Sequence, residues 1–167
     1  RYVLVYNGEI YNHRALRSDL EGRGHSFRGG CDTEVMVAAF EEWGLDAVRS
    51  FNGMFAFALW DRHARALHLG RDRMGEKPLY YGWMGDTLLF GSELKSLRGH
   101  PKFRGSIDRA ALLHFFRFGY VPAPRSIYEG IAKVPPAHTV TVRAGARIAE
   151  EPTPYWSLRE AAGAGLR

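Results

Sequence analysis

The chain has 167 residues, of which 46% are hydrophobic, enough for one packed domain, and no apolar run is long enough to cross a membrane. Its net charge of +5 comes from arginines scattered along the chain rather than from a dense basic block, so the composition argues against a nucleic-acid-binding protein. The single cysteine, Cys31, excludes an internal disulfide and indicates a reducing, cytoplasmic location, and the histidines show no metal-binding spacing beside it, so we expect no metal site.

The first third of the chain predicts strands at residues 2–6 and 25–27 and helices at residues 13–21, 33–43 and 45–50. The first strand is an apolar β run. The longer helices show apolar residues at helical spacing, and Gly44 stops the second of them. Asn12 stands where an N-cap of the first helix is expected.

Paired strands dominate the rest of the chain. Residues 54–60 carry apolar side chains on both faces, which indicates a sheet that is covered on both sides. The other predicted elements are a strand at 66–70, a hairpin of 79–83 with 87–90, helices at 93–97 and 108–116 with Asp108 as N-cap, a final hairpin of 139–142 with 147–148, and a tail at 156–167 that is a linker or a frayed helix. Consecutive hairpins mixed with helices predict an α+β fold with largely antiparallel sheets.

Two short polar motifs form the candidate binding site. Asn7 offers a side-chain NH2 and Gly8 an unobstructed backbone N–H, and together these groups suit a developing oxyanion. Glu9 and Asp32 are carboxylates that suit a substrate ammonium. Each motif also has a structural interpretation, because Asn-Gly after a β run is typical of a turn and Asp32 before a helical run is typical of an N-cap.

A third motif, residues 71–81, follows the central strands. Gly75 permits a tight turn, and Asp72 can join Arg71 and Arg73 in an ion-pair and hydrogen-bond network beneath it. We interpret the motif as structural. Anion binding by the two arginines is the functional alternative.

Six segments carry a resemblance to a known family. They are NGEIYN (7–12), CDTEV (31–35), FNGMFAFALWD (51–61), RDRMGEKPLYY (71–81), FGSELKSL (90–97) and GYVPAPRSIYEGIAKVPPAH (119–138). In this order they resemble the glutamine-hydrolysing domain of glutamine-dependent asparagine synthetases, which are class II glutamine amidotransferases of the N-terminal-nucleophile hydrolase fold. The resemblance implies a four-layer α/β/β/α sandwich with two mostly antiparallel sheets.

The resemblance also implies a reaction and a set of site residues. In the family an N-terminal cysteine attacks the side-chain amide of glutamine, its own α-amino group acts as base, and the ammonia passes to a C-terminal ATP-dependent synthetase domain that makes asparagine. Asn7 and Gly8 match the oxyanion-hole positions and are the expected catalytic residues. Asp32 matches the carboxylate that binds the glutamine ammonium, and Glu9 matches a second contact to the same end. The domain itself is expected to hold no cofactor, because ATP and Mg belong to the synthetase domain.

The family's catalytic cysteine lies upstream of the strand at residues 2–6, so we expect an internal fragment that is inactive alone. The amidotransferase domain is predicted at 1–155, with a linker at 156–167 toward the synthetase domain. Cys31 is expected to have a packing role. A non-catalytic scaffold related to β-lactam synthetases and an amidotransferase acting on another carboxylate remain as alternatives, and a homodimer is left open.

Overall fold

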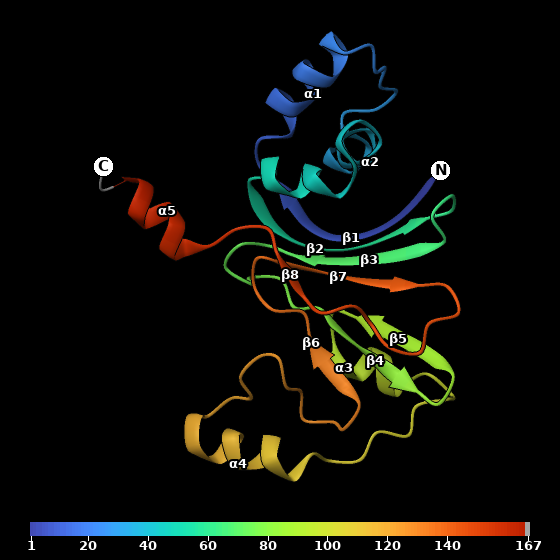
Figure 1. Ribbon diagram of the computed structural model, residues 1–167, viewed down its shortest axis with the longest axis vertical. Coiled ribbons are helices and arrows are strands. Elements are labelled where there is room, and N and C mark those ends of the chain that lie inside the picture. The colour runs from blue at the N-terminus through green and yellow to red at the C-terminus, as the bar shows by residue number, and fades with distance from the viewer. Residues whose placement is uncertain (166–167) are drawn as a thin grey trace.

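The computed structural model describes residues 1–165 and shows two β-sheets between two layers of helices (Figure 1). The strands are β1 (Tyr2–Ile10), β2 (Gly53–Asp61), β3 (Ala66–Arg71), β4 (Tyr80–Met84), β5 (Thr87–Gly91), β6 (Ile131–Lys133), β7 (His138–Arg143) and β8 (Thr153–Pro154). The helices are α1 (His13–Gly22), α2 (Asp32–Trp43), the 3₁₀ helix η1 (Gly44–Ser50), α3 (Leu94–Arg98), α4 (Arg109–Phe118) and α5 (Leu158–Gly165). The predicted α+β class and the α/β/β/α layering are confirmed.

The strands of both sheets pair in antiparallel fashion. The larger sheet has the order β1-β2-β3-β7-β8, and the smaller sheet has the order β5-β4-β6. Helices α1 and α2 cover the outer face of the larger sheet, whereas α3 and α4 lie on the side of the smaller sheet (Figure 1). Since β1 is an edge strand, one side of its backbone is not paired within its sheet.

The hydrophobic core consists of two layers, one on each face of strand β2. On the helix side, Phe40 of α2 packs against Phe51 and Phe57, with ring centroids 5.5 and 5.2 Å apart. Between the two sheets, Ala56 and Ala58 are buried in a second apolar cluster. Both faces of β2 are therefore covered, as the apolar residues on both of its faces predicted.

The turn after β3 is built around the carboxylate of Asp72, which is 1% exposed. It accepts backbone N–H bonds of 2.9–3.2 Å from Phe55, Met74, Glu76 and Lys77. The guanidinium of Arg71 donates to three backbone carbonyls, so it is held by the chain itself rather than by an anion. The structural interpretation of residues 71–81 is confirmed, although the network runs to the backbone instead of through side-chain ion pairs.

Strand β1 is longer than predicted. It continues through Asn7 and Gly8 to Ile10, because these residues pair with the start of β2 in an unbroken register that ends at Ile10 with Gly53. The interpretation of Asn7-Gly8 as a turn is therefore wrong. The partner strand lies more than forty residues away, and local sequence patterns do not report such pairing.

Two further predictions differ from the structure, and one strand of the smaller sheet was missed. Residues 25–27 form no strand, and the N–H of His25 instead closes the end of α1 by donating to Leu20. Residues 147–148 form no hairpin with β7, which pairs with β3 and β8. Strand β6 was not predicted, because its three residues acquire their partner only through β4.

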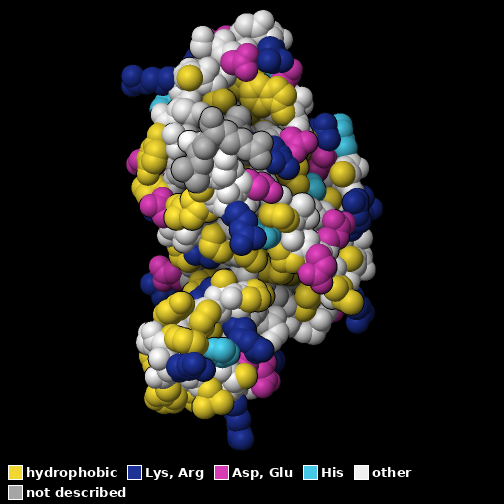
Figure 2. Space-filling model, turned by 60° about the vertical axis from the view of Figure 1, so that its left-hand side comes forward, with side chains coloured by type: hydrophobic (Ala, Val, Ile, Leu, Met, Phe, Trp, Pro, Cys, Tyr) yellow, Lys and Arg dark blue, Asp and Glu magenta, His cyan; other side chains and the backbone are white. Residues whose placement is uncertain are grey.

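Helix α4 is the least covered of the longer helices that flank the sheets. Asp108 caps it as predicted, accepting the N–H groups of Ala110 and Ala111, yet Ala111 is its one buried residue. Figure 2 shows hydrophobic side chains gathered at the lower end of the molecule, where α4 lies in Figure 1. No helix within residues 1–165 is long and apolar enough to cross a membrane.

The C-terminal tail is helical. Helix α5 has no buried side chain, whereas Tyr155 just before it is buried and donates its hydroxyl proton to the carbonyl of Arg71. Tyr155 and the partly buried Trp156 both pack on the core, and the domain boundary at residue 155 remains a prediction. Residues 166 and 167 of the predicted linker lie outside the described residues.

Candidate functional site

The side chains of strand β1 point into two different environments, one on each face of the strand. Tyr6 points to the helix layer, where its hydroxyl reaches Asp32 at the start of α2. Asn7 points the other way, and its amide Nδ2 donates to the hydroxyl of Ser92, which directly follows β5. The strand therefore joins the two halves of the sandwich at the position of the predicted site.

Gly8 lies between these two side chains, and its backbone N–H faces the open edge of the sheet. Its partner in β2, Phe55, directs both its N–H and its C=O to Asp72 on the β3 side. Gly8 is therefore at a non-hydrogen-bonded position, where the backbone groups point away from the partner strand. A free N–H donor at this point is what an oxyanion hole requires.

Only glycine fits at this position. Gly8 has a φ of +150°, and a Cβ atom added there would lie 2.1 Å from the carbonyl oxygen of Met54. Any side chain would therefore push β1 away from β2 or change the direction of the Gly8 peptide. Gly8 thus presents its edge N–H at a position that only glycine can occupy.

Asp32 is the first residue of α2 rather than its N-cap, so the capping interpretation is wrong. The N-cap is Cys31, whose side chain makes no capping hydrogen bond. The carboxylate oxygen Oδ2 of Asp32 instead accepts the N–H of Ile10 at 3.0 Å and the hydroxyl of Tyr6 at 2.8 Å. These bonds fix the carboxylate against the end of β1.

The surroundings of Asp32 keep it ionised. Burial raises the pKa of its carboxyl group, but hydrogen bonds from the Ile10 N–H, the Tyr6 hydroxyl and the Thr33 N–H, together with the nearby His13, leave the pKa below its ordinary value. Burial and the bond to Asp32 raise the pKa of the Tyr6 hydroxyl, which therefore remains a proton donor. The pair provides a fixed negative charge at neutral pH.

The predicted site residues fall into two adjoining hollows. Glu9 and Asp32 line one cavity of about 380 Å³, together with Tyr11, His13 and Cys31. Asn7 lines a smaller cavity of about 150 Å³ on the side of the second sheet, beside Ser92. The structure thus brings Glu9 and Asp32 into one cavity, whereas Asn7, which is on the same face of β1 as Glu9, lines the other cavity, and Gly8 stands between them in the strand.

Two residues of this region were not predicted, and one was misjudged. Tyr6 was interpreted only as part of a strand, and Ser92 lay in a motif that was used only for its resemblance. Cys31 is exposed and lies in the cavity of the two carboxylates, so the expected packing role is wrong. The position of its thiol depends on how α2 meets β1, which local sequence does not show.

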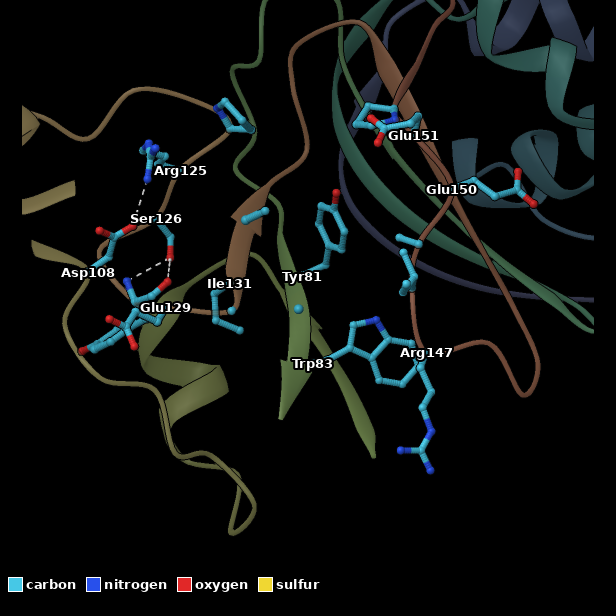
Figure 3. Close-up of a pocket in the computed structure, with 18 residues that line it drawn as sticks. Tyr81, Trp83, Asp108, Arg125, Ser126, Glu129, Ile131, Arg147, Glu150 and Glu151 are labelled. Atoms are coloured by element: carbon cyan, nitrogen blue, oxygen red, sulfur yellow. Dashed lines mark hydrogen bonds and ion pairs between the residues drawn. The ribbon is translucent and has the colours of Figure 1, made fainter. Parts of the chain in front are cut away.

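A hollow of about 520 Å³ on another part of the molecule is lined by none of the predicted site residues (Figure 3). Tyr81 and Trp83 of β4 form one wall, and the segment from Arg147 to Pro152 forms another. Among its charged side chains, Arg125 pairs with Asp108 at 3.1 Å and Glu150 pairs with Arg143 at 2.9 Å. Within residues 1–165 no cluster of three or more His, Cys, Asp or Glu side chains is placed to hold a metal ion.

Sequence comparison identifies relatives of this chain. The glutamine-hydrolysing asparagine synthetase 3 of Bacillus subtilis is 43% identical over 141 residues, which are 84% of this chain and 23% of that protein. A putative glutamine-hydrolysing asparagine synthetase of Mycobacterium tuberculosis is 37% identical over 97% of this chain and 25% of its own length. The chain therefore spans about a quarter of the relatives that it matches.

Structure comparison supports the same fold. A glutamine phosphoribosylpyrophosphate amidotransferase from B. subtilis superposes with a TM-score of 0.60 over 89% of this chain and 28% of its own, at 21% identity. The sequence profile of the glutamine amidotransferase domain matches residues 1–156. The chain belongs to the glutamine amidotransferase domain family.

Proposed function

We propose that this chain is the glutamine-binding part of a glutaminase that supplies ammonia to an ATP-dependent asparagine synthetase. The proposal rests first on the ionised Asp32, held by Ile10 and Tyr6 beside Glu9. A fixed carboxylate in a small cavity complements the ammonium group of free glutamine. The relatives support the choice, since they are named as glutamine-hydrolysing asparagine synthetases.

The proposed chemistry is acyl transfer to a thiol. The sulfur of a cysteine preceding residue 1 in the full-length protein attacks the side-chain carbonyl carbon of glutamine. As the S–C bond forms, the π electrons of the carbonyl group move to its oxygen. The oxyanion is stabilised by the N–H of Gly8 and by the amide Nδ2 of Asn7. Ammonia leaves with a proton relayed by the α-amino group, and water then hydrolyses the thioester to glutamate and restores the thiol.

The geometry of Asn7 is compatible with this role. Its Nδ2 carries two hydrogens, and the bond to the hydroxyl of Ser92 uses one of them, at a distance of 3.2 Å. That bond fixes the orientation of the amide and leaves the second hydrogen for the substrate. Ser92 thus acts as a positioning residue for the amide of Asn7.

The remaining steps belong to the synthetase region that such proteins carry. There ATP and Mg would activate a carboxylate, with aspartate as the proposed acceptor, and the ammonia released here would complete the amide. Residues 156–167 are proposed as the link to that region. This domain alone is proposed to be inactive, because its one cysteine, Cys31, lies beside the ammonium-binding carboxylates and not beside Asn7.

Asp32→Asn in the full-length protein tests the assignment. The substitution removes the charge that pairs with the substrate ammonium, so we expect the glutamine KM to rise at least about tenfold while kcat changes by less than about threefold. Cys31→Ser, in the same cavity, is the matched control and should leave both constants unchanged. An unchanged KM in Asp32→Asn would show that glutamine binds elsewhere.

A further inference from the structure

Helix α4 presents an apolar surface that this domain does not cover. Leu113 is 70% exposed and Phe116 is 75% exposed, and Phe115, Phe118 and Tyr120 beside them are also exposed. We call these five residues the α4 patch. Exposed apolar side chains gathered in this way mark interaction surfaces.

The aromatic rings of the α4 patch and its surroundings contact one another instead of the core. The rings of Phe115 and Phe116 lie 6.1 Å apart and those of Phe118 and Tyr120 lie 6.4 Å apart, and Phe118 also stacks on His114 at 5.8 Å. The helix ends are well defined, since Asp108 caps the start and Gly119 ends the helix with a φ of +75°. The patch therefore belongs to a properly formed helix whose outer face lacks a partner.

The surface beside the α4 patch extends toward the segment that precedes helix α5. The hollow of Figure 3 has Pro124 and Arg125, which follow α4, on one side and Glu150 to Pro152, which precede α5, on the other. In Figure 1, α4 lies at the lower end of the molecule and α5 extends to the left at the level of the larger sheet, and Figure 2 brings this left-hand side forward. Helix α5 also has no buried side chain.

We propose that the α4 patch is the docking surface for the synthetase region of the same polypeptide. This inference rests on the proposed function, because the relatives are about four times as long as this chain. The docking surface of that region should be apolar with carboxylates at its edge. Arg109 and Arg117 of α4 are exposed, and neither forms an ion pair with another described residue.

The size of the patch favours a tethered domain over a second copy of the chain. A helix of ten residues is about 15 Å long and roughly 10 Å across, so its outer face is far smaller than the ~800 Å² per partner of a typical stable complex. Two regions of one polypeptide meet at a high effective concentration and are held by smaller interfaces.

Phe116→Asp in the full-length protein tests the docking directly. Three rates are measured: glutamine hydrolysis, amide synthesis from free ammonia, and amide synthesis from glutamine. We expect the first two to stay within about twofold and the third to fall at least tenfold, because ammonia released at an undocked domain escapes to solvent. Met74→Asp, which is 63% exposed and lies in the turn after β3, away from α4 and from the hollow of Figure 3, is the control and should change none of the three rates.

Hydrogen exchange separates this inference from the proposed function. Amides of residues 112–120 should be protected in the full-length protein and should lose that protection in Phe116→Asp, whether or not glutamine is hydrolysed. Unchanged exchange together with unchanged glutamine-dependent synthesis would overturn the docking. A dimer that becomes a monomer in Phe116→Asp, with all three rates retained, would show that a second copy occupies the patch and would also overturn it.

Discussion

Asp32 and Asp72 are both aspartates in prominent polar motifs, but the structure uses them in opposite ways. Asp72 is buried and its oxygens accept four backbone N–H groups, so no acceptor position is left for a ligand. Asp32 has one oxygen fixed by Ile10 and Tyr6 and lines an open cavity. A polar side chain whose hydrogen bonds are all made to the protein's own backbone is therefore structural, whereas one that keeps an acceptor facing a cavity can bind a ligand.

The largest effect is expected at the structural aspartate. In Asp72→Ala four backbone N–H groups lose their acceptor in a buried turn, so we expect a loss of roughly 3–5 kcal/mol in the free energy of unfolding of this domain. Thermal denaturation of the full-length protein measures it. Asp86→Ala, which removes an exposed ion pair with Lys102 and a hydrogen bond from the Thr87 hydroxyl, should leave the free energy of unfolding almost unchanged. Equal effects of the two substitutions would contradict the account of the Asp72 turn.

The next effect is expected on catalysis alone. Asn7→Ala removes one oxyanion donor, which is worth about 2.7–4 kcal/mol of transition-state stabilisation, so glutamine hydrolysis should slow by at least about a hundredfold. The free energy of unfolding should change little, because the Asn7 side chain is exposed. Asn12→Ala is the control, since that amide bonds only the backbone of Ser50 and Asn52. A loss of less than about fivefold in Asn7→Ala would remove Asn7 from the oxyanion hole.

A smaller effect is expected at the residue that positions Asp32. Tyr6→Phe keeps the ring and removes the hydroxyl that donates to the carboxylate, so we expect the glutamine KM to rise by about tenfold with kcat nearly unchanged. Tyr2→Phe, on the same face of β1, should leave the KM unchanged. Equal KM values for the two variants would show that Tyr6 only packs.

The smallest effect is expected from pH. The pKa of Asp32 is lowered, so its carboxylate stays charged above an ordinary Asp pKa of about 3.9 and is neutralised only below it. Calorimetric binding of glutamine should therefore show a constant affinity from pH 7 to pH 5 in the wild-type protein. In Tyr6→Phe the weakening of affinity should begin at a higher pH, because one of the bonds that lower the pKa is gone. A wild-type affinity that falls tenfold between pH 7 and pH 5 would contradict the fixed charge.

The sequence predicted what depends on local pattern. The apolar faces of β2, the hairpin of β4 with β5 and the cap of α4 by Asp108 all follow from neighbouring residues, and the structure contains them. The resemblance supplied the layered fold, which the comparisons confirm. These features need no knowledge of distant partners.

The sequence failed where distant segments decide the structure. Asn7-Gly8 has the composition of a turn, yet pairing with β2 extends it as a strand. Asp32 precedes a helical run as an N-cap residue would, yet its carboxylate oxygen Oδ2 accepts hydrogen bonds from Ile10 and Tyr6 instead. These tertiary contacts contradict the local interpretations. The same contacts place the residues where they can form a binding site.

We propose that β1 and the start of α2 bind glutamine for attack by a thiol. Treatment of the full-length protein with an electrophilic glutamine analogue, followed by mass spectrometry of the adduct, tests this most directly. We predict an adduct on a cysteine that precedes residue 1, prevented by excess glutamine, formed more slowly in Asp32→Asn and unaffected by Cys31→Ser. An adduct confined to Cys31, or no thiol that glutamine protects, would contradict the claim and indicate a domain that serves as a scaffold.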